Sequence, residues 1–244
     1  MGQPVKSQSG PGADPTSPGP TGAPVATGST YRQQQAAATR DRIADAARRL
    51  FGTAGYGSTS MQAIATEAGV AVRTVYSAFG TKREILSLIC ERWLERAQAR
   101  ERAQQVLAEP DPARRLRGAA GWLRNLYQAG FDVVLIFEAA TDESPETRAL
   151  LRSKLAGRNQ VMDAMIGSLD GHLRVSVREA QAVYRALAAP GVYRELVDES
   201  DWTPDQFEQW VADALERQLL VTAPGKISPR PGHRATAAPT PESG

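Results

Sequence analysis

The stretch Gly69–Leu86, GVAVRTVYSAFGTKREIL, predicts a helix of barely two turns between two glycine breaks. A short helix is most easily stabilised by exposed alanine, glutamate or lysine, because these residues favour helix formation. Here the exposed positions instead carry an arginine, two hydroxyls and a phenol, at Arg73, Thr74, Tyr76 and Ser77. Such side chains donate hydrogen bonds to an external partner, so the stretch indicates a recognition surface.

The residues before this helix complete a helix-turn-helix pattern. Counting from Met61, small and apolar residues recur where two crossing helices must pack against each other. They are Ile64, Ala65, Ala68, Gly69, Val70, Val75 and Ala78. In this pattern Ala65 allows the helices to approach closely, and Gly69 permits a left-handed turn. The second helix is predicted over residues 72–79, with its outer face available to the major groove of DNA.

The side chains on that outer face match the chemistry of DNA. Arg73 can reach guanine or a phosphate. Thr74, Tyr76 and Ser77 can donate hydrogen bonds to phosphate oxygens, and the phenol ring can also contact a thymine methyl group. Lys82, at the start of the next predicted helix, adds a cation.

Positive charge is concentrated around this pattern. Residues 32–83 contain eight basic and three acidic side chains, whereas the whole chain of 244 residues has a net charge of only +2. The overall charge neither requires nor excludes a nucleic-acid partner, so the local charge decides. An ordinary helical hairpin in a larger bundle is the alternative interpretation, and the local charge favours DNA binding.

Residues that would support catalysis or metal binding are scarce. The two histidines, His172 and His233, have no plausible cysteine, histidine or carboxylate partners at ligand spacing, and no phosphate-binding glycine loop is present. The single cysteine, Cys90, excludes an intrachain disulfide and suits a reducing cytosol. The longest apolar run, 133–137, is too short to cross a membrane. We therefore expect a cytoplasmic protein that is no enzyme, binds no metal or cofactor and has no membrane partner.

The composition divides the chain into four parts. Residues 1–30 and 223–244 are rich in glycine, proline, serine, threonine and alanine, and are predicted to be disordered. Residues 31–81 are predicted to form the helix-turn-helix DNA-binding domain. Residues 82–222 are predicted to form a ligand-binding and dimerisation domain.

Helical periodicity runs through the chain between the two tails. The first helix is predicted to stop at Gly55, and a capping box is predicted to start the second helix at Thr59. A long helix is then predicted from Lys82 to about Leu107. Further helices are expected at about 112–129, 131–140, 144–171, 176–189 and 204–220. The β-branched run 133–137 could form a strand, but a lone strand has no partner, so we interpret the run as a buried helix.

Residues 39–90, TRDRIADAARRLFGTAGYGSTSMQAIATEAGVAVRTVYSAFGTKREILSLIC, resemble the DNA-binding domain of the tetracycline-repressor (TetR) family of transcription regulators. The matching elements are Ile43, Ala47, Phe51, Gly55-Tyr56, Ile64-Ala65, Ala68-Gly69-Val70, Thr74-Val75-Tyr76, Phe79, Lys82 and Leu86. One departure is Ala71, where the family usually has serine or threonine, and it removes a helix cap worth about 1 kcal/mol. Residues 186–215 are similar to the end of the regulatory domain in many members.

This resemblance implies an all-α fold of about nine helices and a homodimeric regulator that binds a palindromic operator in double-stranded DNA. Two recognition helices about one DNA turn apart, ~34–36 Å, would read the palindrome. The DNA-binding residues are then assigned as Arg40, Thr59, Ser60, Ala71, Val72, Arg73, Thr74, Tyr76, Ser77 and Lys82. We expect a repressor that a small hydrophobic effector releases from its operator. The alternative is a regulator or activator that has no small-molecule effector and is controlled by a protein partner.

Two further sets of residues are predicted in the C-terminal domain. Aromatic and flexible apolar side chains suit an effector pocket. They are Trp93, Trp122, Leu126, Tyr127, Phe131, Phe137, Met162 and Met165. The apolar faces of the last two long helices are predicted to form the dimer interface, through Val183, Tyr184, Leu187, Phe207, Trp210, Val211 and Ala214. For both sets the alternative is that the side chains only fill the core of one chain.

Overall fold

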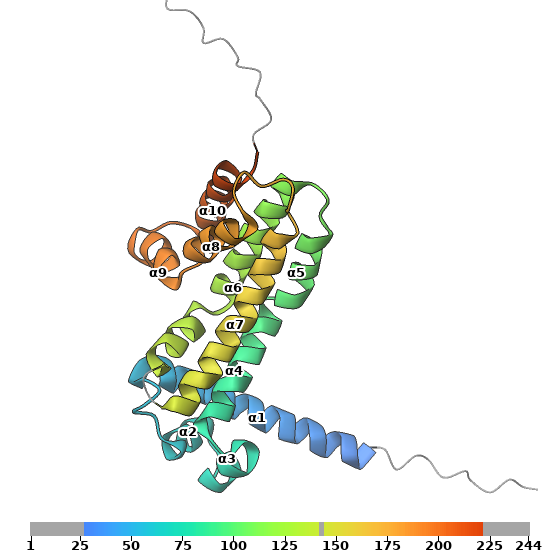
Figure 1. The fold of residues 1–244 in the computed structure, drawn as a ribbon. Coiled ribbons are helices and arrows are strands. Elements are labelled where there is room, and N and C mark those ends of the chain that lie inside the picture. The colour runs from blue at the N-terminus through green and yellow to red at the C-terminus, as the bar shows by residue number, and fades with distance from the viewer. Residues whose placement is uncertain (1–26, 142–143, 222–244) are drawn as a thin grey trace, which may run out of the picture. The chain divides into compact units, whose positions relative to one another are not determined.

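The structure is a computed structural model that describes residues 27–141 and 144–221 (Figure 1). Over these residues the regular structure consists of ten α-helices and one π-helical turn. The predicted all-α fold is therefore confirmed, with ten α-helices in the described residues instead of about nine. Most of the two predicted tails lies outside the described residues, but residues 27–30 form the first turn of a helix.

The chain forms two compact units, and the boundary between them, after Asp41, falls within the first helix, α1 (Thr27–Ala54). In the N-terminal unit the side chains of residues 31–41 are exposed or half-buried. In the second unit α1 buries an apolar stripe that includes Ile43 and Phe51, which are 0% and 2% exposed. The described part of the second unit contains all the remaining helices.

Three helices follow α1: α2 (Met61–Ala68), α3 (Val72–Phe79) and α4 (Lys82–Arg96). The bounds predicted for α3 are confirmed. The capping box predicted at Thr59 is wrong, because the residue that caps α2 is Ser60, whose hydroxyl accepts a hydrogen bond from the amide of Ala63 at 3.0 Å. The Thr59 hydroxyl instead donates to the carbonyl of Gly55 at 2.7 Å, so it closes the preceding loop.

The long helix predicted from Lys82 to about Leu107 is also wrong, because the chain breaks after α4. Gln98 adopts a left-handed conformation with φ of 50°, and α5 (Ala99–Ala108) starts at the next residue. The break lets α5 pack closely on α6 (Pro112–Ala140), where a Cβ atom built at Gly118 would lie 3.1 Å from Val106. This close contact depends on the tertiary packing of two helices, so the periodicity of one segment does not reveal it.

The break predicted between two helices, 112–129 and 131–140, is confirmed at Gly130, whose φ of 172° and ψ of 66° are non-helical. α6 runs through both, and its backbone is non-helical only at Gly130. The run 133–137 is helical, so its interpretation as a buried helix is confirmed, with Val133 and Ile136 at 0% and 3% exposure. α6 packs against α4, α5, α7 (Pro145–Gly167) and α10 (Pro204–Leu219), which makes it the central helix of the unit.

The remaining elements are α8 (Val177–Leu187), α9 (Pro190–Tyr193) and the π-helical turn η1 (Arg194–Glu199). Capping boxes at Ser176 and Thr203 start α8 and α10. Figure 1 shows α4, α6 and α7 running alongside one another, with α2 and α3 near one end of them and α8–α10 near the other. None of the helices formed by the described residues has the length and apolar character that a membrane span requires.

Candidate functional site

The turn between α2 and α3 has the geometry that the sequence predicts. Gly69 is left-handed, with φ of 65° and ψ of 38°, and the amide of Val70 donates to the carbonyl of Ala65 at 3.0 Å. Ala65 is 1% exposed, so its methyl group lies where the helices cross. Only glycine adopts this backbone conformation without strain, which is why the turn is fixed at this position.

The two faces of α3 differ sharply. Val75 and Phe79 are buried, at 0% and 2% exposure, and anchor the helix to the rest of the unit. Arg73 and Ser77 are exposed, and Tyr76 is 55% exposed, which is high for a large aromatic residue. This outer face carries one cation and two hydroxyl groups, as a helix that contacts phosphates and base edges requires.

The other residues predicted at the start of α3 lie at the border of this face. Ala71 is exposed and forms the N-cap of α3 with no side-chain hydrogen bond, so the expected loss of a cap is confirmed. Val72 and Thr74 are half-buried. Of the four residues from Ala71 to Thr74, Ala71 and Arg73 are therefore the exposed ones.

The predicted contacts outside α3 have different surroundings. Ser60 is exposed, although its hydroxyl also caps α2. Thr59 is 3% exposed, so the structure does not bring it to the outer surface. Arg40 is exposed on the N-terminal unit, and its role in DNA binding remains a prediction.

Lys82 makes contacts within the protein. Its ammonium group donates to the backbone carbonyls of Tyr56 at 2.7 Å and Gly57 at 3.2 Å, and lies 4.6 Å from the centroid of the Tyr56 ring. These contacts tie the start of α4 to the loop that follows α1. The sequence pattern could not separate this structural role from the predicted phosphate contact.

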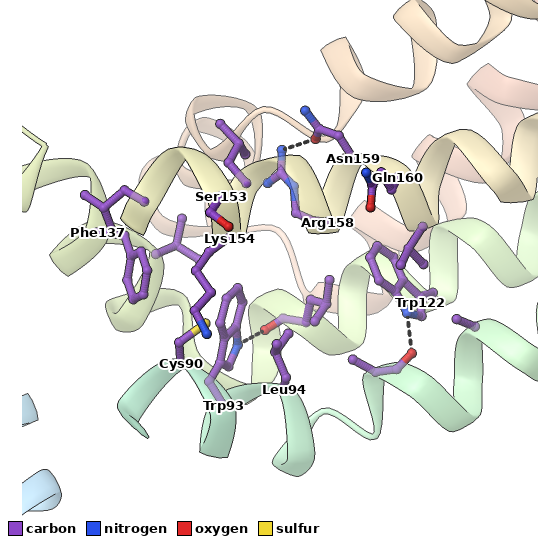
Figure 2. A pocket seen from close by; sticks show the side chains of 18 of the residues that line it. Cys90, Trp93, Leu94, Trp122, Phe137, Ser153, Lys154, Arg158, Asn159 and Gln160 are labelled. Carbon is purple, nitrogen blue, oxygen red and sulfur yellow. Dashed lines mark hydrogen bonds between the residues drawn. The ribbon is translucent and has the colours of Figure 1, made fainter. Parts of the chain in front are cut away.

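A cavity of about 1290 Å³ lies among α4, α5, α6 and α7. Four of the eight residues predicted for the effector pocket line it: Trp93, Trp122, Leu126 and Phe137 (Figure 2). The other four, Tyr127, Phe131, Met162 and Met165, are not among its lining residues. Both methionines are fully buried, and Tyr127 and Phe131 belong to an aromatic cluster with Tyr193, in which ring centroids lie 4.8–5.4 Å apart.

The two tryptophans of the cavity present apolar rings, because their only polar groups are bonded within the protein. The indole nitrogen of Trp93 donates to the carbonyl of Leu126 at 2.7 Å. The indole nitrogen of Trp122 donates to the carbonyl of Ala99 at 2.8 Å. Both bonds are drawn as dashed lines in Figure 2. The rings are thus held in fixed positions and offer only their apolar surfaces to a ligand.

Charged residues of α7 also line the cavity, and the sequence pattern did not indicate them as pocket residues. Lys154 and Arg158 lie one turn apart, and both are half-buried. Lys154 forms an ion pair with Glu91 of α4 at 3.6 Å. The signal that could have identified them is their position on the core-facing stripe of the predicted helix, where apolar residues are expected.

Most of the residues predicted for the dimer interface are buried within one chain. Tyr184, Phe207 and Val211 are 0% exposed, and Ala214 is 5% exposed. The Tyr184 hydroxyl donates to the carbonyl of Ala119 on α6 at 2.6 Å, so α8 is fixed to the core of its own chain. Of the residues predicted for the interface, Val183, Leu187 and Trp210 are half-buried and keep part of their surface exposed.

A helix-turn-helix with an exposed polar face on its second helix defines the class of this protein, which is a DNA-binding protein. Residues 43–89 match the family model described as bacterial regulatory proteins, tetR family. No curated protein matches the chain by sequence at a significant level. Residues 43–89 therefore form a DNA-binding domain of the TetR type, which indicates a DNA-binding transcriptional regulator.

Solved structures share the fold at low sequence identity. A protein from Saccharomonospora viridis, in complex with choline, is 22% identical with a TM-score of 0.61, over 76% of this chain and 100% of that chain. The transcriptional regulator FadR from Bacillus subtilis, in complex with stearoyl-CoA, is 19% identical with a TM-score of 0.59, over 71% and 96%. The TetR-family regulator PfmR from Thermus thermophilus is 22% identical with a TM-score of 0.57, over 72% and 98%.

Proposed function

We propose that the protein is a repressor that binds a palindromic operator as a homodimer and leaves it when a small apolar ligand enters the cavity. The observation that carries this proposal is the position of α4. One end of α4 contacts α3, and Ile85 and Leu86 at that end are fully buried, whereas Trp93 near its other end lines the cavity. A shift of Trp93 would therefore be transmitted along one helix to α3.

A second contact supports this coupling. A Cβ atom built at Gly130, the kink of α6, would lie 2.8 Å from the Trp93 ring and 3.2 Å from the guanidinium group of Arg48. The cavity wall, the kink and α1 are thus in direct contact. Dense packing of this kind transmits small displacements, because such interiors are hardly compressible. A coupling of about 1–3 kcal/mol would change operator affinity ~5–150-fold.

The relatives support the presence of a ligand. The S. viridis protein was solved with choline and B. subtilis FadR with stearoyl-CoA, so this fold accommodates small molecules of different chemistry. The cavity of this chain, about 1290 Å³ in volume, is larger than the ~300–1,000 Å³ of common ligand pockets. It has the room and the apolar lining that a ligand with a long apolar portion requires.

The experiment that tests DNA binding is the selection of bound sequences from a random double-stranded DNA pool, at a stated salt concentration. We expect a palindrome whose half-sites are about 10 base pairs apart, centre to centre. The Arg73→Ala variant, selected in parallel, should lose preference at one position of each half-site and bind the enriched site about 1–3 kcal/mol less tightly. If the folded protein enriches no sequence, α3 is not a recognition helix.

The alternative, a regulator controlled by a protein partner, is tested with the enriched site. A library of small apolar compounds is screened for release of the protein from this DNA. Release by at least one compound that binds the protein at the cavity supports the repressor mechanism. If cavity-binding compounds leave DNA affinity unchanged, the effector mechanism fails while the DNA-binding function stands.

A further inference from the structure

We propose that the cavity binds an amphiphile whose anionic head, a carboxylate, pairs with Arg158, while its apolar chain lies against the tryptophan-lined wall. This inference rests on the proposed function and names the chemical class of its ligand. It concerns a residue that the helical pattern places where an apolar side chain is expected.

Arg158 lies on the core-facing stripe of α7. The buried residues of this helix include Leu151, Met162 and Met165, and positions 154 and 158 continue the same spacing of three and four residues. Arg158 is half-buried, and its Nε atom is fully buried. A cation at such a position has lost much of its hydration, so it needs an anion or a set of acceptors to offset the cost.

The described part of the chain supplies no such anion. The Arg158 guanidinium donates to the side-chain oxygen of its neighbour Asn159, a neutral acceptor, at 3.4 Å (Figure 2), and its Nε atom has no partner among the described residues. No carboxylate of the described residues forms an ion pair with it. Two other half-buried cations of this region are paired with carboxylates, Lys154 with Glu91 and Arg185 with Asp163, and Arg148 donates to the carbonyl of Thr141 at 3.1 Å.

The Arg158 guanidinium also forms a hydrogen bond with the Tyr127 hydroxyl, a group that could in principle carry a negative charge. Burial raises the pKa of Tyr127 to about 12, although Arg158 opposes this shift, so the phenol stays neutral at physiological pH. The hydroxyl also donates its proton to the carbonyl of Ala188. Tyr127 therefore cannot supply the negative charge, and Arg158 is left for an external carboxylate, which can accept hydrogen bonds from two of its nitrogens.

The rest of the cavity suits the apolar chain of such a ligand. The rings of Trp93 and Trp122 offer no free polar group, because both indole nitrogens are bonded to backbone carbonyls. Leu107 and Leu155 also line the cavity and are unusually exposed for leucines, at 40% and 49%. These exposed leucines lie on α5 and α7, so we infer that an apolar chain enters between these two helices.

A cationic ligand fits the same cavity poorly. Among the described lining residues, Glu91 is paired with Lys154, and Glu138 is paired with Arg194 at 3.0 Å. The other acidic lining residues, Glu95 and Glu101, are exposed. A buried quaternary ammonium group would thus meet the unpaired charge of Arg158 and no unpaired buried carboxylate of the described residues.

The test compares three compounds with one chain and different heads: dodecanoate, dodecanol and dodecyltrimethylammonium. Their affinities for the full-length protein are measured by titration calorimetry, below the concentrations at which they form micelles. We expect dodecanoate to bind about ten- to a hundred-fold more tightly than dodecanol, from charge-assisted hydrogen bonds. Dodecyltrimethylammonium should bind more weakly than dodecanol.

Variants then test whether Arg158 causes the difference in affinity between dodecanoate and dodecanol. Arg158→Gln should abolish the preference for dodecanoate and leave the affinity for dodecanol unchanged, whereas Arg158→Lys should retain part of the preference. Arg178→Gln, which removes an exposed arginine of α8 outside the cavity, should leave all three affinities unchanged. Circular dichroism checks that each variant is folded, and the comparison of heads in the unmodified protein stands even if a variant is not.

Three outcomes would overturn the inference. They are equal binding of dodecanoate and dodecanol, a preference that persists in folded Arg158→Gln, and no binding of either compound. None of them affects DNA binding, which is measured separately by selection from the random pool. Failure of that selection, with the dodecanoate preference intact, would reject the repressor function and keep the carboxylate site.

Discussion

Arg48 of α1 and Asp132 of α6 form a bidentate ion pair. The Nε and Nη2 atoms of Arg48 donate to the two carboxylate oxygens of Asp132, each at 2.6 Å. Asp132 lies two residues after Gly130, the kink of α6. The pair therefore fixes a helix of the DNA-binding region to the part of α6 that bends beside the cavity.

The Asp132→Asn variant should be less stable than the unmodified protein at neutral pH. Arg48 is 19% exposed and Asp132 is 52% exposed, so solvent screening limits the expected loss to about 1 kcal/mol. Unfolding by urea measures this difference. The control is Asp213→Asn, which weakens a more exposed pair with Arg217 at 3.9 Å and should change stability by less.

The same comparison has a defined pH dependence. The Arg48 guanidinium lowers the pKa of Asp132 below its ordinary value, despite an opposing effect of burial. A lowered pKa in the folded state means that the stabilisation is present above the ordinary aspartate pKa of about 3.9 and is lost as the pH falls through the lowered value. The stability difference between the unmodified protein and Asp132→Asn should therefore shrink below about pH 4. A difference that persists undiminished at lower pH would mean that it does not arise from the charge of Asp132.

Gly130→Ala should destabilise the protein by overpacking. The added methyl group would lie 2.8 Å from the Trp93 ring, which is held by its bond to the Leu126 carbonyl, so the ring cannot easily move aside. We expect a loss of roughly 1–3 kcal/mol. The matched control is Gly52→Ala in α1, where a Cβ atom meets nothing within 4 Å. That variant should gain up to about 1 kcal/mol, because alanine favours a helix over glycine.

Thermal and urea unfolding of both variants provide the measurement. If Gly130→Ala is as stable as Gly52→Ala, then Trp93 moves without cost and the proposed coupling through the kink loses its physical basis. Both variants add one methyl group, but Gly52 lies in a regular helix and Gly130 at a non-helical position, so the gain of up to about 1 kcal/mol from helix propensity belongs to Gly52→Ala alone. A stability difference larger than that gain reports the packing at the kink.

The DNA-binding helices could be predicted closely because their geometry depends on residues near in sequence. Gly69 must adopt the left-handed turn, and Val75 and Phe79 must face inward, so the bounds of α3 follow from spacing alone. The predicted cap of α2 is wrong by one residue, since Thr59 and Ser60 can both cap a helix. Only the loop contact of Thr59 with Gly55 decides between them.

The cavity could be predicted only in part, because it depends on how distant helices meet. Trp93 and Trp122 line it, whereas Met162 and Met165, with the same apolar character, face the interior of the unit. Residue type does not distinguish these two environments. Arg158 could not be predicted on the basis of apolar character at all, because it is a charged residue on the inner stripe of a helix.

Lys82→Met should lower stability and leave the salt dependence of DNA binding unchanged. The ammonium group of Lys82 donates to the carbonyls of Tyr56 and Gly57, and its removal takes one donor from each of them, although the Tyr56 carbonyl also accepts from the amide of Thr59 at 3.4 Å. Thermal unfolding should show a lower midpoint. The slope of log affinity against log salt concentration decreases by about one for each phosphate that the protein no longer neutralises. A decrease of that size in Lys82→Met would assign Lys82 to a phosphate, as the sequence pattern predicts.

Trp210→Asp should shift the protein from dimer to monomer. Trp210 is half-buried at the border of the apolar stripe of α10, one turn after the buried Phe207, and its ring packs edge to face with Trp202, at 6.4 Å between centroids. A half-buried tryptophan on a helix surface retains apolar area that a second copy can cover, and such residues contribute strongly to interfaces. A carboxylate at the centre of that surface would be buried without a partner, which is costly.

Light scattering measures the outcome at several protein concentrations. The unmodified chain should have about twice the mass of one 26.2 kDa chain, and Trp210→Asp should approach the mass of one. Leu155→Asp is the control, since Leu155 is an exposed leucine of α7 at 49% exposure and lies outside the predicted interface. A dimer that survives Trp210→Asp and dissociates in Leu155→Asp would place the interface on α7. Because Leu155 also lines the cavity, a second copy bound there would cover part of the cavity wall.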